Sequence, residues 1–142
     1  MMSGSITRRG VLTGAAVIAG VTALPAFLTP AGTARSAIGH VVVDARLAHS
    51  APFAGGFVGA NIHRVDALDD LCNRWYTRLR REVLADGRHI AGLTTWIDYV
   101  VMQSCAAEIG YRGAPGPLFS TTTAAASSDH VRMVTWVFAP RN

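Results

Sequence analysis

Apolar and polar positions beyond residue 37 follow the pattern of a small α/β domain. The continuous apolar run at 40–44 is typical of a strand that is buried on both faces. A second, shorter strand is predicted at 61–66, and a short helix at 53–59 connects the two strands. A strand, a helix and a strand in succession favour a parallel pair of strands joined by a crossover.

Two longer helices follow this unit. From position 68 the apolar residues recur at helical spacing, and the Asp-Gly-Arg stop at 86–88 ends the helix. A further helix begins at Thr94 or Thr95 and runs to Ile109, and Gly110 supplies a typical C-terminal stop. The residues between the two helices are predicted to form a loop, which allows the helices to pack antiparallel.

A hairpin completes the predicted domain. The segments 118–124 and 130–138 are predicted to be two strands joined by a loop of small residues. The element order is therefore βαβααββ. We expect a single small α/β domain, built on a mixed sheet of three to four strands with packed helices.

The N-terminal quarter of the 142-residue chain has a different pattern. The segment 5–13 (SITRRGVLT) places Arg8 and Arg9 directly before a weakly apolar stretch that ends near Leu28. These residues resemble the leader of twin-arginine translocation (Tat) substrates, in which two adjacent arginines precede a moderately hydrophobic segment. The resemblance implies export by the twin-arginine translocation machinery, which moves proteins that have already folded.

The same resemblance implies a domain organisation and a location. A signal peptide would span residues 1–36, with cleavage after Ala34 or Ser36, and the α/β domain would span 37–142. The mature protein would lie in the periplasm or outside the cell, with no stable transmembrane span. Two alternatives stay open: an ordinary secretory leader with a chance arginine pair, and an uncleaved leader that anchors the protein in the membrane.

The charge and the composition of the mature domain each argue against one class of function. All nine acidic residues follow the leader, which itself holds three of the 13 basic residues, so the domain is close to neutral. It therefore lacks the basic surface typical of proteins that bind nucleic acid. The chain also contains no lysine, which excludes a lysine nucleophile or Schiff base.

Two cysteines matter if the protein is exported, because the compartment outside the cytoplasm is oxidising. Cys72 lies early in the second predicted helix and Cys105 late in the third, so an antiparallel pair of helices would bring them level. They either form a disulfide or stay buried as free thiols, and a catalytic or metal-binding role is the third alternative. No Cys-x-x-Cys spacing occurs, so thioredoxin-like chemistry and common zinc ribbons are not supported.

The five histidines show none of the short spacings that are typical of metal sites. They are His40, His49, His63, His89 and His130. Only tertiary proximity could bring such residues together, so the sequence predicts no metal site. It also contains no cofactor motif.

Acids at the ends of the two predicted parallel strands give one candidate site. Asp44 ends the first strand and Asp66 ends the second, and open α/β sheets bind ligands at the carboxyl ends of such strands. His49 and Ser50 follow Asp44, so a serine, a histidine and an aspartate could form a nucleophilic triad. The alternative is structural: the acids bond to loop backbone, and Ser50 caps the following helix.

The start of the third predicted helix gives a second, ligand-binding candidate. Exposed amide groups near Thr94 and Thr95 could hold an anion, and Arg88 and His89 immediately before them would add positive charge. The alternative is again structural, because Thr95 with Asp98 three residues later is a variant of the helix capping box.

Two functions from different classes are compatible with these patterns. The first, which we favour, is a small exported accessory or interaction protein associated with a larger exported enzyme, for example a redox enzyme. The second is a small-ligand-binding protein or hydrolase that uses the carboxyl edge of the sheet. Whether the protein is itself an enzyme is left open.

An accessory role would need a partner surface, and the second helix offers arginines beside several aromatic residues. The alternative is a solvated arginine face next to aromatic side chains that are buried in the core. The residues concerned are Arg74, Arg78, Arg81, Trp75, Tyr76, Trp96, Tyr99 and Trp136.

Overall fold

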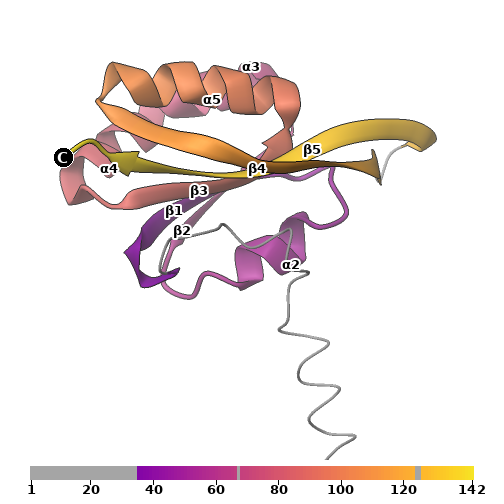
Figure 1. Cartoon of the computed structure of the whole chain (residues 1–142), viewed down its shortest axis with the longest axis horizontal. Coiled ribbons are helices and arrows are strands. Elements are labelled where there is room, and N and C mark those ends of the chain that lie inside the picture. The colour runs from indigo at the N-terminus through magenta and orange to yellow at the C-terminus, as the bar shows by residue number, and fades with distance from the viewer. Residues whose placement is uncertain (1–34, 67, 124–125) are drawn as a thin grey trace, which may run out of the picture.

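The domain is built on one mixed five-stranded sheet with helices on both faces (Figure 1). In the computed structural model, the described residues are 35–66, 68–123 and 126–142. The twin-arginine segment and the predicted leader up to residue 34 lie outside the described residues. The expectations about export and cleavage therefore stay predictions.

The strands lie in the order β2-β1-β3-β5-β4. β1 pairs parallel with both β2 and β3, whereas β5 pairs antiparallel with both β3 and β4. The strands are Ile38–Asp44 (β1), Asn61–Val65 (β2), His89–Thr95 (β3), Tyr111–Thr123 (β4) and Ala126–Pro140 (β5). The predicted α/β class and the parallel pairing of the first two strands are confirmed, but the sheet has more strands than the three or four expected.

Figure 1 shows α3, α4 and α5 on one face of the sheet and the short α2 on the other. α3, a π-helical turn and α4 follow one another without a break, so the helix predicted from position 68 is confirmed together with its end near Gly87. Among the described residues, no helix has the length and apolar character needed to cross a membrane. The bounds are Arg35–Ala37 (a 3-10 helix), Ser50–Gly55 (α2), Leu68–Arg74 (α3), Trp75–Leu79 (the π-helical turn), Arg80–Asp86 (α4) and Trp96–Glu108 (α5).

Side chains that alternate along β1 join the two hydrophobic cores. All seven residues of β1 are buried. Val42 belongs to the core beneath α3, α4 and α5, together with Trp75 and Trp136. Val41 and Val43 point the other way, into the core that α2 covers. The uninterrupted apolar run is what a strand buried on both faces requires.

The central strand β3 is the main departure from the predicted layout. The sequence predicts a loop at 87–92 followed directly by a helix, whereas β3 occupies His89–Thr95 between β1 and β5. Gly92 lies in the middle of this strand because the Trp136 ring packs there. A Cβ atom on Gly92 would lie 2.0 Å from Trp136 Cζ2. Tertiary packing, rather than local sequence preference, thus selects the strand.

Several predicted ends of elements are confirmed and one is wrong. Thr95 caps α5, since its Oγ1 accepts a hydrogen bond of 3.2 Å from the Asp98 amide. Gly110 follows α5 with a positive φ of 77°. Ser50 is not a cap: it is the first residue of α2, which starts earlier than predicted, and His49 holds the cap position without a side-chain cap hydrogen bond. The C-terminal hairpin is confirmed, with longer strands than predicted.

Candidate functional site

The sheet has one edge at which ligands of α/β proteins usually bind. β1 is followed by α2 on one face, whereas its parallel neighbour β3 is followed by α5 on the other face (Figure 1). The chain therefore leaves the carboxyl ends of two adjacent parallel strands in opposite directions. Such a topological switch point is the usual position of a binding crevice in open α/β sheets.

Four polar residues gather at this edge, and we call Asp44, Arg46, Thr95 and Asp98 the carboxyl-edge cluster. Asp44 is the last residue of β1 and Thr95 is the last residue of β3. Arg46 follows β1 by two residues, and Asp98 lies in the first turn of α5. Because β1 and β3 run parallel, their ends and the residues just beyond them meet on one side of the sheet.

Asp44 is fully buried, and Arg46 neutralises it. Asp44 Oδ1 accepts hydrogen bonds from the backbone N and from Nε of Arg46, both at 2.9 Å, and Oδ2 accepts one from Nη2 at 2.6 Å. The Arg46 side chain is 42% exposed, so this ion pair reaches from the core to the surface. A buried carboxylate needs such a partner, because burying an unpaired charge is very costly.

Asp98 is also buried, but one of its oxygens has no hydrogen-bond partner among the described residues. Its Oδ2 lies 4.0 Å from Arg46 Nη2, which is too far for a hydrogen bond. Burial, and after it the nearby Asp44 carboxylate, raise the pKa of Asp98 above its usual value. Two buried carboxyl groups thus share one guanidinium. A carboxyl group in this position is a candidate for ligand contact or proton transfer.

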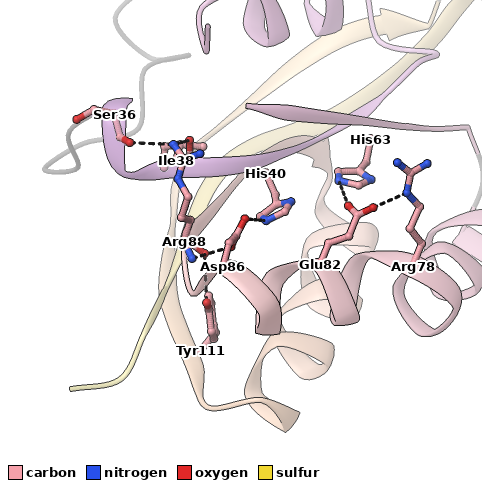
Figure 2. A network of polar contacts seen from close by, with 9 residues as sticks. All are labelled: Ser36, Ile38, His40, His63, Arg78, Glu82, Asp86, Arg88 and Tyr111. Carbon is pink, nitrogen blue, oxygen red and sulfur yellow. Dashed lines mark hydrogen bonds and ion pairs between the residues drawn. The ribbon is translucent and has the colours of Figure 1, made fainter. Parts of the chain in front are cut away.

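The predicted anion site at the start of the third helix is not assembled as expected. Thr94 is buried, where its Oγ1 accepts a hydrogen bond from Trp136 Nε1 (2.9 Å) and donates one to the Thr95 carbonyl (3.0 Å). Arg88 precedes β3, so all seven residues of that strand separate it from α5. Its Nη2 donates instead to two backbone oxygens at and before the start of β1 (3.0 and 2.9 Å; Figure 2). Arg88 and Thr95 therefore lie at opposite ends of β3.

The predicted serine, histidine and aspartate group is only partly brought together. Ser50 is buried, and its Oγ donates a short hydrogen bond to the Asp44 carbonyl oxygen, so the hydroxyl proton is already used. His49 is half-buried just before α2. Asp66 is exposed after β2. The hydrogen bond to Asp44 is the main cause that raises the pKa of Arg46, and the charge of Asp66 adds a smaller contribution. These candidate residues lie near the same edge of the sheet, but the Ser50 hydroxyl is bonded to the backbone of β1.

Cys72 and Cys105 both carry free thiols in the structure. Burial, and after it the nearby Cys72, raise the pKa of Cys105 to about 11. The Cys105 thiol is therefore protonated at neutral pH and is a poor nucleophile. The disulfide between these cysteines, which export would favour, stays a prediction.

A second group of polar side chains lies between α4 and the sheet, towards the beginning of β1 (Figure 2). We call His40, His63, Glu82 and Asp86 the histidine cluster. His40 lies on β1, His63 on β2, and both acids on α4. The two histidines are buried, whereas the acids are partly exposed. His40 shares a face of β1 with Val42, two residues further on, so it faces the helical layer.

Hydrogen bonds and ion pairs connect the histidine cluster. His40 Nε2 donates to Asp86 Oδ2 at 2.7 Å. His63 Nε2 lies 3.5 Å from Glu82 Oε2, and Arg78 Nε donates to Glu82 Oε1 at 2.6 Å. Burial lowers the pKa of His63 to about 4 despite the opposing charge of Glu82, so the ring is neutral at neutral pH. The hydrogen bond from Arg78 lowers the pKa of Glu82, which is ionised.

The histidine cluster contains the residues that could hold a metal ion. His40, His63 and Glu82 each offer one ligand atom, and these three atoms lie within 4.8 Å of one another. The spacing of histidines along the chain gives no sign of this group, because its members come from three separate elements. Tertiary proximity alone assembles it.

Sequence reasoning also misses two members of the carboxyl-edge cluster as site residues. Arg46 carries a usable signal, since a basic residue two positions beyond a strand-end aspartate can turn back onto it. Asp98 carries no separate signal, because the capping pattern with Thr95 already accounts for it.

Comparisons with known proteins do not place the chain in a family. No protein-family model matches it, and neither a curated protein nor a solved structure matches it. The two clusters therefore carry the functional inference.

Proposed function

We propose that the protein is an exported domain that binds a small polar ligand at the carboxyl-edge cluster. The observation that supports this most is the buried Asp98 Oδ2, which has no hydrogen-bond partner within the described part of the chain and lies beside a partly exposed arginine at the topological switch point. Buried polar atoms are normally paired, and those that are not often mark a site that a ligand completes. A hydroxyl or amine of the ligand would donate to Asp98, and a ligand oxygen would accept from Arg46.

Ligand access depends on Arg46, because it is the exposed member of the cluster. Its guanidinium is held by Asp44 on one side and lies 4.0 Å from Asp98 on the other. A modest rotation of the arginine would open Asp98 to the ligand without breaking the backbone hydrogen bond to Asp44. We favour binding over hydrolysis because the buried Ser50 hydroxyl is bonded to backbone.

Thermal-shift measurements on the full-length protein with panels of amino acids, hydroxy acids and monosaccharides test this proposal. We expect a concentration-dependent rise in melting temperature with at least one panel. Asp98→Asn and Arg46→Gln should weaken that response about tenfold, which corresponds to about 1.4 kcal/mol. Arg64→Gln is the matched control, because Arg64 is an exposed arginine on the neighbouring strand β2. A ligand that binds Asp98→Asn as tightly as the wild type rules the site out.

The accessory role is a second candidate, and the outer face of α5 favours it. Trp96, Ile97 and Val100 are 39%, 65% and 43% exposed, and their spacing along the helix places them side by side. Grouped exposed apolar side chains are typical of surfaces that contact another protein. This face begins directly after Thr95, so a companion protein bound here would lie next to the carboxyl-edge cluster.

Purification of the protein from the exported fraction of its own cells tests the accessory role. A partner present in stoichiometric amount with the wild type and lost with Ile97→Arg would support it. Leu84→Arg is the control, because Leu84 is an exposed apolar residue on α4, away from this face. Wild-type protein that leaves the cell as a monomer without a partner contradicts the accessory role.

Export itself rests on the arginine pair of the leader. Replacement of both Arg8 and Arg9 by lysine should hold the protein in the cytoplasm if the Tat machinery exports it. Fractionation and immunoblotting measure the exported share. Unchanged export of this variant would favour the ordinary secretory route.

A further inference from the structure

Three atoms of the histidine cluster stand out because they are buried and have no hydrogen-bond partner among the described residues. They are His40 Nδ1, His63 Nε2 and Glu82 Oε2. An ordinary buried polar network pairs such atoms with one another or with backbone. His63 Nε2 and Glu82 Oε2 lie 3.5 Å apart, but they do not form a hydrogen bond with each other.

Asp86 and Arg78 hold His40 and Glu82, respectively, in orientations that suit a metal ion. Asp86 can only accept, so His40 Nε2 carries the proton of their 2.7 Å hydrogen bond and Nδ1 keeps a free lone pair. A carboxylate behind a metal-binding histidine fixes the ring and its tautomer in this way. Arg78 holds Glu82 by Oε1, which leaves Oε2 directed towards His63 (Figure 2).

We infer that His40, His63 and Glu82 bind a first-row divalent transition metal ion, with Zn²⁺ as the reference case. Two imidazole nitrogens and one carboxylate oxygen form a ligand set that such ions accept. Three protein ligands leave one coordination position open for water or another small ligand. The partly exposed acids of α4 provide the route by which the ion would enter.

The ligand atoms need to move a little closer together on binding. Ligands at 2.0–2.2 Å around a tetrahedral Zn²⁺ lie roughly 3.4 Å apart, whereas the three atoms are now spread over up to 4.8 Å. Glu82 is the ligand that can move, because its side chain is flexible and partly exposed, whereas both histidines are buried on strands of the sheet. The nearby Arg78 is 59% exposed and could bind an anionic group that occupies the open position.

This site is separate from the proposed ligand site. His40 and Asp44 are four residue steps apart on an extended strand, a distance of about 13 Å. Failure of one proposal therefore leaves the other untouched. The first 36 residues contain no histidine, cysteine, aspartate or glutamate, so the leader of the full-length chain cannot compete for the metal.

Titration of the full-length protein with Zn²⁺ and with Co²⁺ tests the inference. We expect one Zn²⁺ per chain by calorimetry, and a visible Co²⁺ absorption spectrum that is typical of four nitrogen and oxygen ligands. His63→Gln and Glu82→Gln should each weaken Zn²⁺ binding at least tenfold. Circular dichroism and urea unfolding of the metal-free variants show whether they are folded.

His89→Gln is the matched control, because it removes a half-buried histidine that lies outside the cluster. It should leave Zn²⁺ binding within twofold of the wild type. Absence of stoichiometric binding by the wild type overturns the inference, and so does binding that folded His63→Gln and Glu82→Gln both retain. If a variant does not fold, loss of the Co²⁺ spectrum in the other, folded variant decides the question.

Discussion

The carboxyl-edge cluster and the histidine cluster lie at the two ends of the same strand, and they hold charge in different ways. At the carboxyl edge two buried carboxyl groups share one arginine, so the edge has an excess of negative charge when Asp98 is ionised. In the histidine cluster the neutral His63 ring and the His40 ring face two acids, one of which is already paired with Arg78. The first arrangement suits a ligand that donates hydrogen bonds, and the second suits a cation.

The two clusters also differ in how the chain assembles them. The carboxyl-edge residues lie at the ends of β1 and β3 or within three residues of them, so the topology alone brings them together. The histidine cluster depends on how α4 packs across β1 and β2. We therefore expect the carboxyl edge to tolerate changes in helix packing better than the histidine cluster does.

The largest expected effect is a loss of stability from a substitution in the central strand β3. Gly92→Ala places a Cβ atom 2.0 Å from the Trp136 ring, which should lower the free energy of unfolding by about 3 kcal/mol. Gly55→Ala is the control, because nothing lies within 4 Å of its Cβ position, and we expect its stability to be unchanged or slightly higher. Urea unfolding measures both. Equal stabilities of the two variants would show that Gly92 does not limit the packing of β3.

The next largest loss of stability is expected from a substitution that breaks the ion pair between Asp44 and Arg46 at the carboxyl edge. Asp44→Asn removes the charge that holds Arg46 and should cost about 2 kcal/mol of stability, because Asp44 accepts three hydrogen bonds from that arginine. Zn²⁺ affinity should stay the same, since the histidine cluster lies at the other end of β1. Calorimetric Zn²⁺ titration of the folded variant measures this, and a tenfold loss would show that the clusters are coupled.

Asp86→Asn tests the positioning role of Asp86 behind His40. An amide can donate to the ring as well as accept from it, so the histidine tautomer is no longer fixed. We expect Zn²⁺ to bind about tenfold more weakly, which is about 1.4 kcal/mol, and the Co²⁺ spectrum to change in shape. An unchanged affinity and spectrum would remove Asp86 from the account.

The smallest effect is a pH dependence at the carboxyl edge, where Asp44, Arg46 and Thr95 surround Asp98. The pKa of Asp98 is raised in the folded protein, so between the unfolded value near 3.9 and the folded value the native state holds more protons. In that window the contribution of Asp98 to stability falls as pH rises. The stability of Asp98→Asn relative to the wild type should therefore increase from pH 4 to pH 7, by about 0.5 kcal/mol. Urea unfolding at both pH values measures the difference, and a decrease would show that the pKa is lowered instead.

The sequence predicts the elements that have a strong local pattern. The apolar run of β1, the helical spacing from position 68 and the Thr95 cap all correspond to the structure. β3 is missed because its centre is a glycine, which lowers local strand preference and is explained only by the Trp136 ring from β5. The extra strand also explains why Arg88 and Thr95 do not meet.

The two candidate sites also differ in whether a local sequence pattern predicts them. Asp44 and the carboxyl edge follow from the position of a strand end, which the sequence shows. His40 and His63 meet because two parallel strands pair in register, with His40 opposite Asn61 and His63 opposite Val42. Glu82 joins the two histidines because α4 packs across β1 and β2. Neither the strand register nor this packing can be read from the spacing of the histidines along the chain.

Amide chemical-shift mapping of the ¹⁵N-labelled full-length protein with Zn²⁺ tests the central claim, that one sheet carries two separate sites. We predict shifts at His40, His63 and Glu82 that saturate at one equivalent, and none at Asp44, Arg46 or Asp98. Shifts centred on the carboxyl edge, or no saturable shifts at all, would contradict it.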